Sequence, residues 1–315
     1  MSPEVTRASR RDRLVGGLEA GGTKFVCAVG DGPGGAMRAR TQFDTGEDPA
    51  ALLRRVIAWF AEQEREHGML EAIGVASFGP VDLDETSSTY GSITTTPKKG
   101  WRNTDLVGPL RRAFPNRPIG FDTDVNGAAL GEGRWGAASG LDDFIYVTVG
   151  TGIGGGGVAR GKLLHGLVHP EMGHIPMPVL DGDAFAGSCR FHGRCWEGLC
   201  AGPAIEMRAG RRAEDIASDD PLWDLTARYM AHALLTLTYV LSPKRIIVGG
   251  SVRKAGRLGE VAFFVRMREH FRCVNNGYIA SPALEQGGLD AYIVPPALGD
   301  DAGVCGAFAL GLDAL

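Results

Sequence analysis

The chain has 315 residues, of which 44% are hydrophobic and 22% charged, enough apolar surface for one large or two medium domains. Its formal net charge of −4 argues against nucleic-acid binding, because contacts to phosphates need a basic surface. The most apolar helix candidate, Met230–Leu241, is too short to span a bilayer. Residues 1–13 lack the apolar core of a signal peptide. We therefore expect a cytoplasmic protein with a disordered tail at 1–13 that binds neither nucleic acid nor membrane.

The first elements expected along the chain are two strands joined by a tight glycine turn, within Leu14–Gly30. Apolar residues with helical spacing follow at Pro49–His67. A short apolar strand then occupies Leu70–Pro80 and ends at Gly-Pro. The segment Pro118–Gly136 begins as a strand, becomes a helix at 124–126 and ends near Gly136.

A second strand pair with a glycine turn is expected at Asp143–Gly166. After it come a loop rich in Cys and His, a helix after Gly202–Pro203, a long helix over 221–241 and a strand within Lys244–Val252. The chain closes with a strand, a glycine loop and a last helix. Alternating strands and helices favour an α/β fold, and the repeated strand pair favours two lobes with a cleft between them.

The first glycine turn, Gly21, Gly22, Thr23 and Lys24, is a candidate phosphate loop. It offers backbone N–H groups, a hydroxyl donor and a positive charge to an anion. The same letters also fit an ordinary glycine hairpin, and the Walker A spacing is absent.

The second glycine turn, Gly150–Gly156, matches G-x-G-x-x-G by letter. A dinucleotide site needs a helix to begin there, whereas the following residues indicate a returning strand. Two such turns facing each other would clamp a triphosphate, which resembles the pattern of the sugar-kinase, actin and Hsp70 superfamily. That resemblance places Gly249 and Gly250 near the adenosine.

Asp124, between a predicted strand and a predicted helix, is the candidate general base. Phosphoryl transfer to a hydroxyl needs a base beside the attacking oxygen. Asp122 would share a face with Asp124 if the strand continued. The alternative is that Asp122 or Asn126 only caps the helix that follows.

The spacing C-x2-H-x2-C brings Cys189, His192 and Cys195 together in the Cys- and His-rich loop. With reduced cysteines, this spacing indicates a metal site before a disulfide. The fourth ligand would be one of three neighbours: His174, His169 or Cys200. Two sulfurs and two imidazoles suit tetrahedral Zn2+, and a closed site of four ligands is structural. Bystander cysteines in a loop are the alternative.

Together these residues resemble the ROK family of sugar kinases and repressors, most closely its bacterial fructokinase branch. The resemblance covers Leu14 to the C-terminus through motifs in the same order: GGLEAGGTKFVCAVG, SFGPVD, TPKKGW, TDVNGAALGE, GTGIGGG, HPEMGH, CRFHGRCWEGL and LGDDAG. It implies a two-lobed ribonuclease-H-like fold of the actin, hexokinase and Hsp70 superfamily with an interdomain cleft. We predict a smaller N-terminal α/β lobe, 14–121 plus 300–315, and a larger C-terminal α/β lobe, 122–299, carrying the zinc loop.

The resemblance also implies roles for single residues, with ATP, Mg2+ and a structural Zn2+ as cofactors. Asp124 matches the catalytic Asp. Zinc would be held by His174, Cys189, His192 and Cys195. The nucleotide would contact Gly21, Gly22, Thr23, Lys24, Gly150, Thr151, Gly152, Gly154, Gly249 and Gly250. The hexose would contact Gly79, Pro80, Thr96, Thr123, Asp124, Glu171, His174 and Glu197; a solvated loop charge is the alternative for Glu197.

Three positions depart from the wider family. Thr123 stands where its glucokinases usually carry Asn, and Glu19 where many members have Asp. The zinc set has two Cys and two His, where glucokinases often have three Cys and one His. These departures agree with the fructokinase branch, and leave open whether Glu19 orients the Mg2+ water.

The predicted activity is that of an ATP-dependent fructokinase, a phosphotransferase that moves the γ-phosphate to the 6-hydroxyl of D-fructose, working as a homodimer. Mannose, glucose or an amino sugar stays open as the main substrate. A non-catalytic sugar sensor and a zinc-dependent hydrolase with an open metal position are alternatives from other classes. Repressors of the family carry an added helix-turn-helix, which the 13 polar residues before Leu14 cannot form, and this favours an enzyme.

Overall fold

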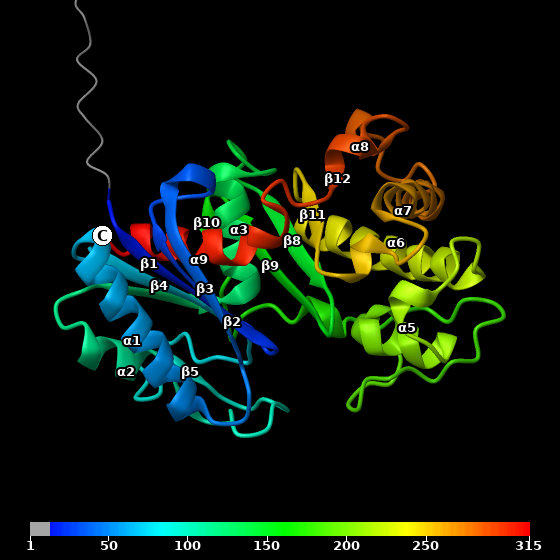
Figure 1. Ribbon diagram of the computed structural model, residues 1–315. Helices are drawn as coiled ribbons and strands as arrows, with labels where there is room; N and C mark the ends of the chain where they lie inside the picture. The colour runs from blue at the N-terminus through cyan, green and yellow to red at the C-terminus, as the bar shows by residue number, and fades with distance from the viewer. Residues whose placement is uncertain (1–12) are drawn as a thin grey trace, which may run out of the picture. The chain divides into compact units, whose positions relative to one another are not determined.

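A computed structural model describes residues 13–315, so the tail expected at 1–13 lies outside the described residues except for Arg13. The described chain forms two compact units (Figure 1). Unit 1 contains residues up to Asp124 together with Val304–Leu315, and unit 2 contains Val125–Gly303. The lobe boundaries expected from the sequence, 121/122 and 299/300, stay a prediction about the functional lobes.

Unit 1 is built on a five-stranded sheet of order β3-β2-β1-β4-β7. β1 pairs with β2 and β2 with β3 antiparallel, whereas β1 with β4 and β4 with β7 are parallel. The strands are β1 (Val15–Ala20), β2 (Lys24–Gly30), β3 (Met37–Asp44), β4 (Ala72–Ser77) and β7 (Ile119–Thr123). A separate two-stranded sheet contains β5 (Ser92–Ile93) and β6 (Thr104–Asp105).

The helices of unit 1 cover this sheet. They are α1 (Pro49–His67), α2 (Val107–Ala113) and all but the first two residues of α9 (Ala302–Asp313). α1 begins where Asp48 caps the amide of Ala51 at 2.9 Å, with proline in the first turn. α9 packs backbone to backbone on β4, because a Cβ on Gly74 would lie 1.7 Å from the carbonyl oxygen of Ala307.

Unit 2 repeats the sheet of unit 1 with the order β10-β9-β8-β11-β12. Two antiparallel pairings are again followed by two parallel ones. The strands are β8 (Phe144–Val149), β9 (Ile153–Ala159), β10 (Lys162–Leu163), β11 (Ile246–Gly249) and β12 (Ile293–Val294). The second strand pair that the sequence predicts is therefore confirmed as β8 and β9, which lie inside a repeated sheet whose edge strands are β10 and β12.

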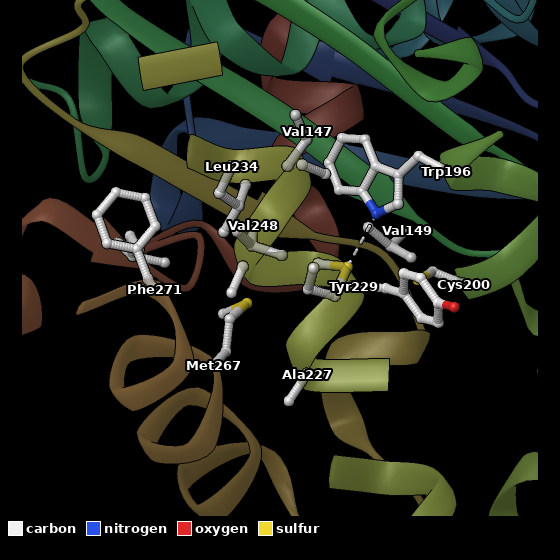
Figure 2. Close-up of a cluster of buried hydrophobic side chains, with 14 of the residues drawn as sticks. Val147, Val149, Trp196, Cys200, Ala227, Tyr229, Leu234, Val248, Met267 and Phe271 are labelled. Atoms are coloured by element: carbon white, nitrogen blue, oxygen red, sulfur yellow. Dashed lines mark hydrogen bonds between the residues drawn. The ribbon is translucent and has the colours of Figure 1, made fainter. Parts of the chain in front are cut away.

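The core of unit 2 lies between this sheet and the long helices α6 and α7 (Figure 2). The helices are α3 (Asp124–Trp135, whose first residue lies in unit 1), α4 (Trp196–Cys200), α5 (Gly202–Ala209), α6 (Pro221–Leu241), α7 (Glu260–Asn275) and α8 (Leu289–Tyr292). Trp196 is fully buried, and its indole donates to the sulfur of Met230 at 3.3 Å. α4 is thereby fixed to α6.

Short 3-10 helices complete the two units: Gly34–Ala36, Met172–His174, Ala213–Asp215, Val252–Lys254, Pro282–Leu284 and Gly299–Asp301. Glu132 of α3 is fully buried, and its carboxylate accepts the amides of Ala137, Ala297 and Leu298 at 2.6, 3.1 and 2.9 Å. These bonds satisfy a carboxylate that would be costly to bury alone. Within residues 13–315, no helix has the length and hydropathy needed to cross a bilayer.

Candidate functional site

The first glycine turn lies between β1 and β2, as the sequence predicts. The amide of Gly21 donates to the carbonyl of Lys24 at 2.9 Å, and buried Thr45 donates from its hydroxyl to Gly21 O at 2.7 Å. Gly22, Thr23 and Lys24 are exposed. A Cβ on Gly22 would meet nothing within 4 Å. The turn has room beside its backbone for a ligand.

The second glycine turn lies between β8 and β9, and a strand follows it, so the helix that a dinucleotide site needs is absent here. Gly150 donates to Gly152 O at 2.9 Å and accepts from Gly202 N at 2.7 Å. Ile153 N donates to a carboxylate oxygen of Glu197 at 2.9 Å. Thr151 at the tip is exposed. This turn is therefore tied to α4 and α5.

Gly249 and Gly250 end β11 beside the second turn. A Cβ on Gly249 would lie 2.2 Å from the hydroxyl of Tyr146, and Gly250 has a φ of +84° close to Val149. Gly250 requires glycine because of its positive φ and the Val149 backbone beside it, whereas a side chain at Gly249 would have to displace the Tyr146 side chain. Ser251 follows, with its hydroxyl 3.7 Å from a Cβ built on Gly150, so this strand end and the second turn are neighbours.

Asp124 is the first residue of α3 and directly follows β7. Thr123 and Asp122 are the buried end of that strand, and the Asp122 carboxylate accepts the Thr123 amide at 2.7 Å. The strand stops before Asp124, so Asp122 and Asp124 do not share a strand face. Asp124 is half-buried at the positive end of the helix.

The other hexose-contact candidates of unit 1 lie on loops after β4 and β5. Gly79 and Pro80 follow β4, and Pro80 O accepts from both the amide and the hydroxyl of Thr94, at 2.8 and 3.1 Å. The hydroxyl of Thr96 accepts from Lys98 N at 3.3 Å. These bonds order the loop that carries Thr96.

The segment Glu171–His174, part of the HPEMGH motif, packs directly on β9. A Cβ on Gly173 would lie 2.0 Å from the carbonyl oxygen of Ile153, and one on Gly155 would lie 2.4 Å from the sulfur of Met172. Glu171 is exposed and His174 half-buried on either side of this contact. The glycine of the motif is explained by close approach of two backbones.

Four side chains of unit 2 converge on one point: His174, Cys189, His192 and Cys195. One ligand atom from each lies within 4.8 Å of all the others. The Nδ1 of His174 is 3.5 Å from Cys195 Sγ and 3.9 Å from Cys189 Sγ, and His192 Nδ1 is 3.8 Å from Cys189 Sγ. In tetrahedral zinc sites with Zn–S of about 2.3 Å and Zn–N of about 2.1 Å, such edges are about 3.6 Å. The donor set and its spacing fit zinc.

Backbone contacts bring these ligands together. Gly193 donates to Cys189 O at 2.8 Å and has a φ of +59°, closing the tight turn that carries His192. The amide of Trp196 donates to Ile175 O at 3.1 Å, which lays the segment after His174 beside Cys195. Burial raises the pKa of the Cys195 thiol to about 11, so a metal ion would displace a proton on binding.

The two other neighbours proposed as the fourth ligand lie outside this group. Cys200 is fully buried in the core of unit 2, where burial raises the pKa of its thiol. His169 is buried with its Nδ1 3.6 Å from a carboxylate oxygen of Glu171.

A family model described as ROK matches residues 15–314. The chain belongs to the ROK family. It is 41% identical over 307 residues to a fructokinase of Zymomonas mobilis subsp. mobilis, covering 96% of this chain and 97% of the relative. It is 39% identical over 302 residues to a fructokinase of Pediococcus pentosaceus, covering 96% and 99%. The ROK glucokinase of Streptomyces griseus, solved in complex with glucose and AMPPNP, matches with a TM-score of 0.71 at 26% identity, covering 95% and 99%.

This ROK chain therefore has the ribonuclease-H-like fold of the actin and hexokinase type, and the predicted fold class is confirmed. The repeated sheet order of the two units is the feature of that fold that positions the two glycine turns. The first turn connects β1 to β2, and the second turn connects the corresponding strands β8 and β9.

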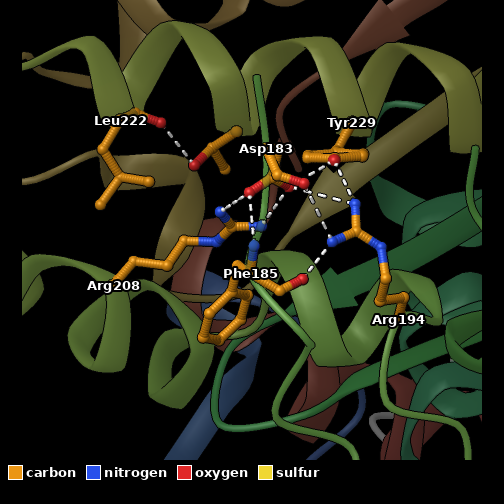
Figure 3. A network of polar contacts seen from close by, with 7 residues as sticks. Asp183, Phe185, Arg194, Arg208, Leu222 and Tyr229 are labelled. Carbon is orange, nitrogen blue, oxygen red and sulfur yellow. Dashed lines mark hydrogen bonds and ion pairs between the residues drawn. The ribbon is translucent and has the colours of Figure 1, made fainter. Parts of the chain in front are cut away.

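One group of polar residues in this ROK protein escaped the sequence analysis. Asp183, in the loop between His174 and Cys189, is buried against two arginines and a tyrosine (Figure 3). The sequence signal available was only an Asp in a loop rich in Gly and Pro. Its partners Arg208 and Tyr229 are 25 and 46 residues away, so no local spacing could reveal them.

Proposed function

We propose that the chain is a fructokinase-type ROK sugar kinase that transfers the γ-phosphate of ATP to the 6-hydroxyl of D-fructose. The observation that carries this proposal is the identity of 39% and 41% to fructokinases over nearly the whole of both chains. The AMPPNP in the related glucokinase structure supports ATP as the donor. Sugar phosphotransfer is also what the family resemblance implies.

Asp124 is proposed as the general base. A carboxylate at the start of a helix, directly after a buried strand, is held in a fixed position from which it can accept the proton of the sugar hydroxyl.

The Gly21–Lys24 turn and the Gly150–Gly154 turn are each proposed to bind phosphate oxygens of ATP. The first offers exposed backbone and the Lys24 charge, and the second offers backbone that is held in shape by Glu197. Gly249 and Gly250 are proposed to contact the adenosine. Mg2+ bound with ATP would supply positive charge to the transferred phosphate.

The four-ligand group is proposed to hold a structural zinc. Two cysteines and two histidines complete a tetrahedral shell and leave no position for a reactive water. A zinc-dependent hydrolase needs that open position, so the four ligands count against it. The metal would order the loop so that Glu171, His174 and Glu197 meet the sugar in fixed positions.

For Glu197 we propose a role beyond the sugar contact that the family resemblance implies. One oxygen of its carboxylate is bonded to Ile153 N, which leaves the other to accept from a sugar hydroxyl. We propose that it contributes both to the shape of the phosphate turn and to sugar binding. Gly79, Pro80, Thr96 and Thr123 stay proposed sugar contacts.

The test is a coupled assay for ADP release with ATP, Mg2+ and a panel of fructose, mannose, glucose and glucosamine. We expect the highest kcat/KM with fructose. A higher kcat/KM with another hexose would transfer the proposal to that sugar. Sugar binding without ADP release from any member would instead support a sugar sensor.

The homodimer and the cytoplasmic location stay predictions. Light scattering coupled to size-exclusion chromatography measures the first directly. A mass near 33.3 kDa, that of one chain, would contradict the dimer.

A further inference from the structure

The carboxylate of Asp183 is the most heavily bonded side chain of the loop between His174 and Cys189, and the proposed mechanism does not use it. Arg208 donates to both of its oxygens, at 2.7 and 2.9 Å, in a bidentate pair. Arg194 donates to one oxygen at 3.2 Å, and Tyr229 donates its hydroxyl to the same oxygen. The amide of Phe185 donates to the other at 3.1 Å. Figure 3 shows the donors converging from three segments.

The side chains of Asp183 and Arg208 are largely buried at the centre of this group, whereas Arg194 is partly exposed. The side chain of Asp183 is 5% exposed and that of Arg208 is 8% exposed. The cost of burying an ion pair is offset only as far as its hydrogen bonds are satisfied. Both Asp183 oxygens accept hydrogen bonds, whereas the buried Nε atoms of Arg208 and Arg194 have no partner among the described residues. The hydrogen bonds from Arg208, helped by that of Tyr229, hold the pKa of the Asp183 carboxyl well below its usual range despite its burial. The carboxylate therefore stays charged and keeps its donors at neutral pH.

Arg194 connects this group to the metal ligands. It lies between His192 and Cys195 in the chain. Besides Asp183, its guanidinium donates to the hydroxyl of Tyr229 at 2.9 Å and to the carbonyl of Phe185. The ligand segment is therefore fastened to α6, and through Asp183 to Arg208 on α5, at a point that involves no metal.

We propose that Asp183 is a positioning residue for the metal site, acting through Arg194 to hold Cys189, His192 and Cys195 close to their ligand geometry before the ion binds. The proposal rests on the zinc site of the proposed function. Ordering a flexible loop costs conformational entropy for every residue that becomes fixed. A loop already ordered by Asp183 avoids that cost when the metal binds. Loss of such a supporting contact typically weakens metal binding by about 10- to 100-fold.

The experiment compares the zinc affinity of the full chain with that of Asp183→Asn, by competition with a chromophoric chelator on metal-free protein. The substitution keeps the shape but places an NH2 group where arginine donors point. Asp224→Asn is the matched control, because Asp224 lies on α6 but pairs with His270 at the surface. We expect Zn2+ binding about 10- to 100-fold weaker in Asp183→Asn and changed less than about twofold in the control.

Arg194→Met decides the question if Asp183→Asn does not fold. It leaves the bidentate Arg208 pair intact and removes only the link to the ligand segment, and we expect zinc binding at least about tenfold weaker. A folded Arg194→Met or Asp183→Asn protein that binds Zn2+ as tightly as the parent would overturn the proposal. Arg194→Lys, which keeps a donor, should recover part of the loss.

This measurement is independent of the kinase reaction. A parent chain that binds Zn2+ but phosphorylates no hexose would overturn the proposed function, and the affinity comparison would stand. In the active enzyme, we expect Arg194→Met at limiting zinc to raise KM for fructose with little change in kcat at saturation. Restoring the parent KM with excess zinc would confirm that the effect passes through the metal site.

Discussion

The two sheets of this molecule have the same strand order and pairing, yet their glycine turns are held differently. The turn of unit 1, Gly21–Lys24, is closed by its own backbone and by Thr45, and its tip is exposed. The turn of unit 2, at Gly150–Ile153, is bonded to Glu197 and Gly202. Glu197 is two residues past Cys195, a proposed metal ligand. The repeat therefore supplies one turn that is held by residues of its own unit's sheet region and one that is bonded to the segment next to the proposed metal site.

The sheets also differ at the end of their fifth strand. β7 is followed at once by Asp124 and helix α3, whereas β12 is followed by Pro295 and Pro296, which bring no carboxylate and cannot donate backbone hydrogen bonds. The acid–base group is therefore proposed for unit 1 alone, and the proposed metal ligands all lie in unit 2. The repeated sheet places a glycine turn and a strand end in each unit, and the residues of the connecting loops determine which function each unit carries.

The largest effect is expected from substituting Asp124, the carboxylate that follows β7. Asp124→Asn should lower kcat by about 10²- to 10⁴-fold, because the sugar hydroxyl loses its base. Asp48→Asn is the matched control, since Asn also caps helices well and Asp48 caps α1. ADP release at saturating ATP and fructose measures both. Near-normal turnover by Asp124→Asn would exclude it as the base.

Metal removal tests whether the turn of unit 2 depends on the metal-bearing segment. We expect chelation, or His192→Ala, to raise KM for fructose about tenfold or more, since disordering even one or two residues costs about 1.4 kcal/mol or more. KM for ATP should rise too, because Glu197 bonds to Ile153 N. Steady-state kinetics at varied zinc provide the measurement. If metal-free protein keeps the parent KM for both fructose and ATP, the Cys- and His-rich loop does not affect binding of either substrate.

Alanine substitutions at Gly152 and Gly22 test whether the two glycine turns are held differently. A Cβ on Gly152 would lie 2.8 Å from a carboxylate oxygen of Glu197, whereas one on Gly22 would meet nothing. Gly152→Ala should therefore displace the end of the Glu197 side chain and weaken its bond to Ile153 N, so ATP binding should fall and stability should fall slightly. Gly22→Ala should leave the melting temperature unchanged and weaken only ATP binding. A Gly22→Ala protein with the parent KM for ATP would show that phosphate does not approach this backbone.

The smallest effect concerns pH. The folded-state pKa of Asp183 is lowered, so its stabilisation is present above the unfolded value of about 3.9 and is lost as pH falls through the folded pKa. The difference in unfolding free energy between parent and Asp183→Asn should be roughly 1 kcal/mol smaller at pH 3 than at pH 7. Urea unfolding at both values measures it. A difference that grows in acid would contradict this.

The elements carried by contiguous patterns were predictable from the sequence. The helix Pro49–His67, the two strand pairs and the junction at Asp124 follow from local periodicity and turn chemistry. β3 was missed because its exposed positions alternate with half-buried ones, and charged residues conceal the strand signal at a sheet edge. α7 was missed because charged residues interrupt its apolar positions.

Only those parts of the candidate site whose residues lie close together in the sequence were predictable. Cys189, His192 and Cys195 lie within one loop, so their convergence was readable, but choosing His174 over His169 needed the family resemblance. The bond between Glu197 and Ile153 N joins residues 44 positions apart, and the Asp183 group spans 46. Such contacts depend on how helices pack, which local periodicity does not encode.

Unit 1 is made of two separate stretches of the chain. Its sheet packs directly on α9, with Gly74 against the backbone of Ala307. The continuous stretch that forms unit 2, Val125–Gly303, lies between β4 and most of α9 in the sequence. A single backbone cut within unit 2 would therefore separate α9 from the strands that it covers. The integrity of unit 1 thus depends on an unbroken chain through unit 2.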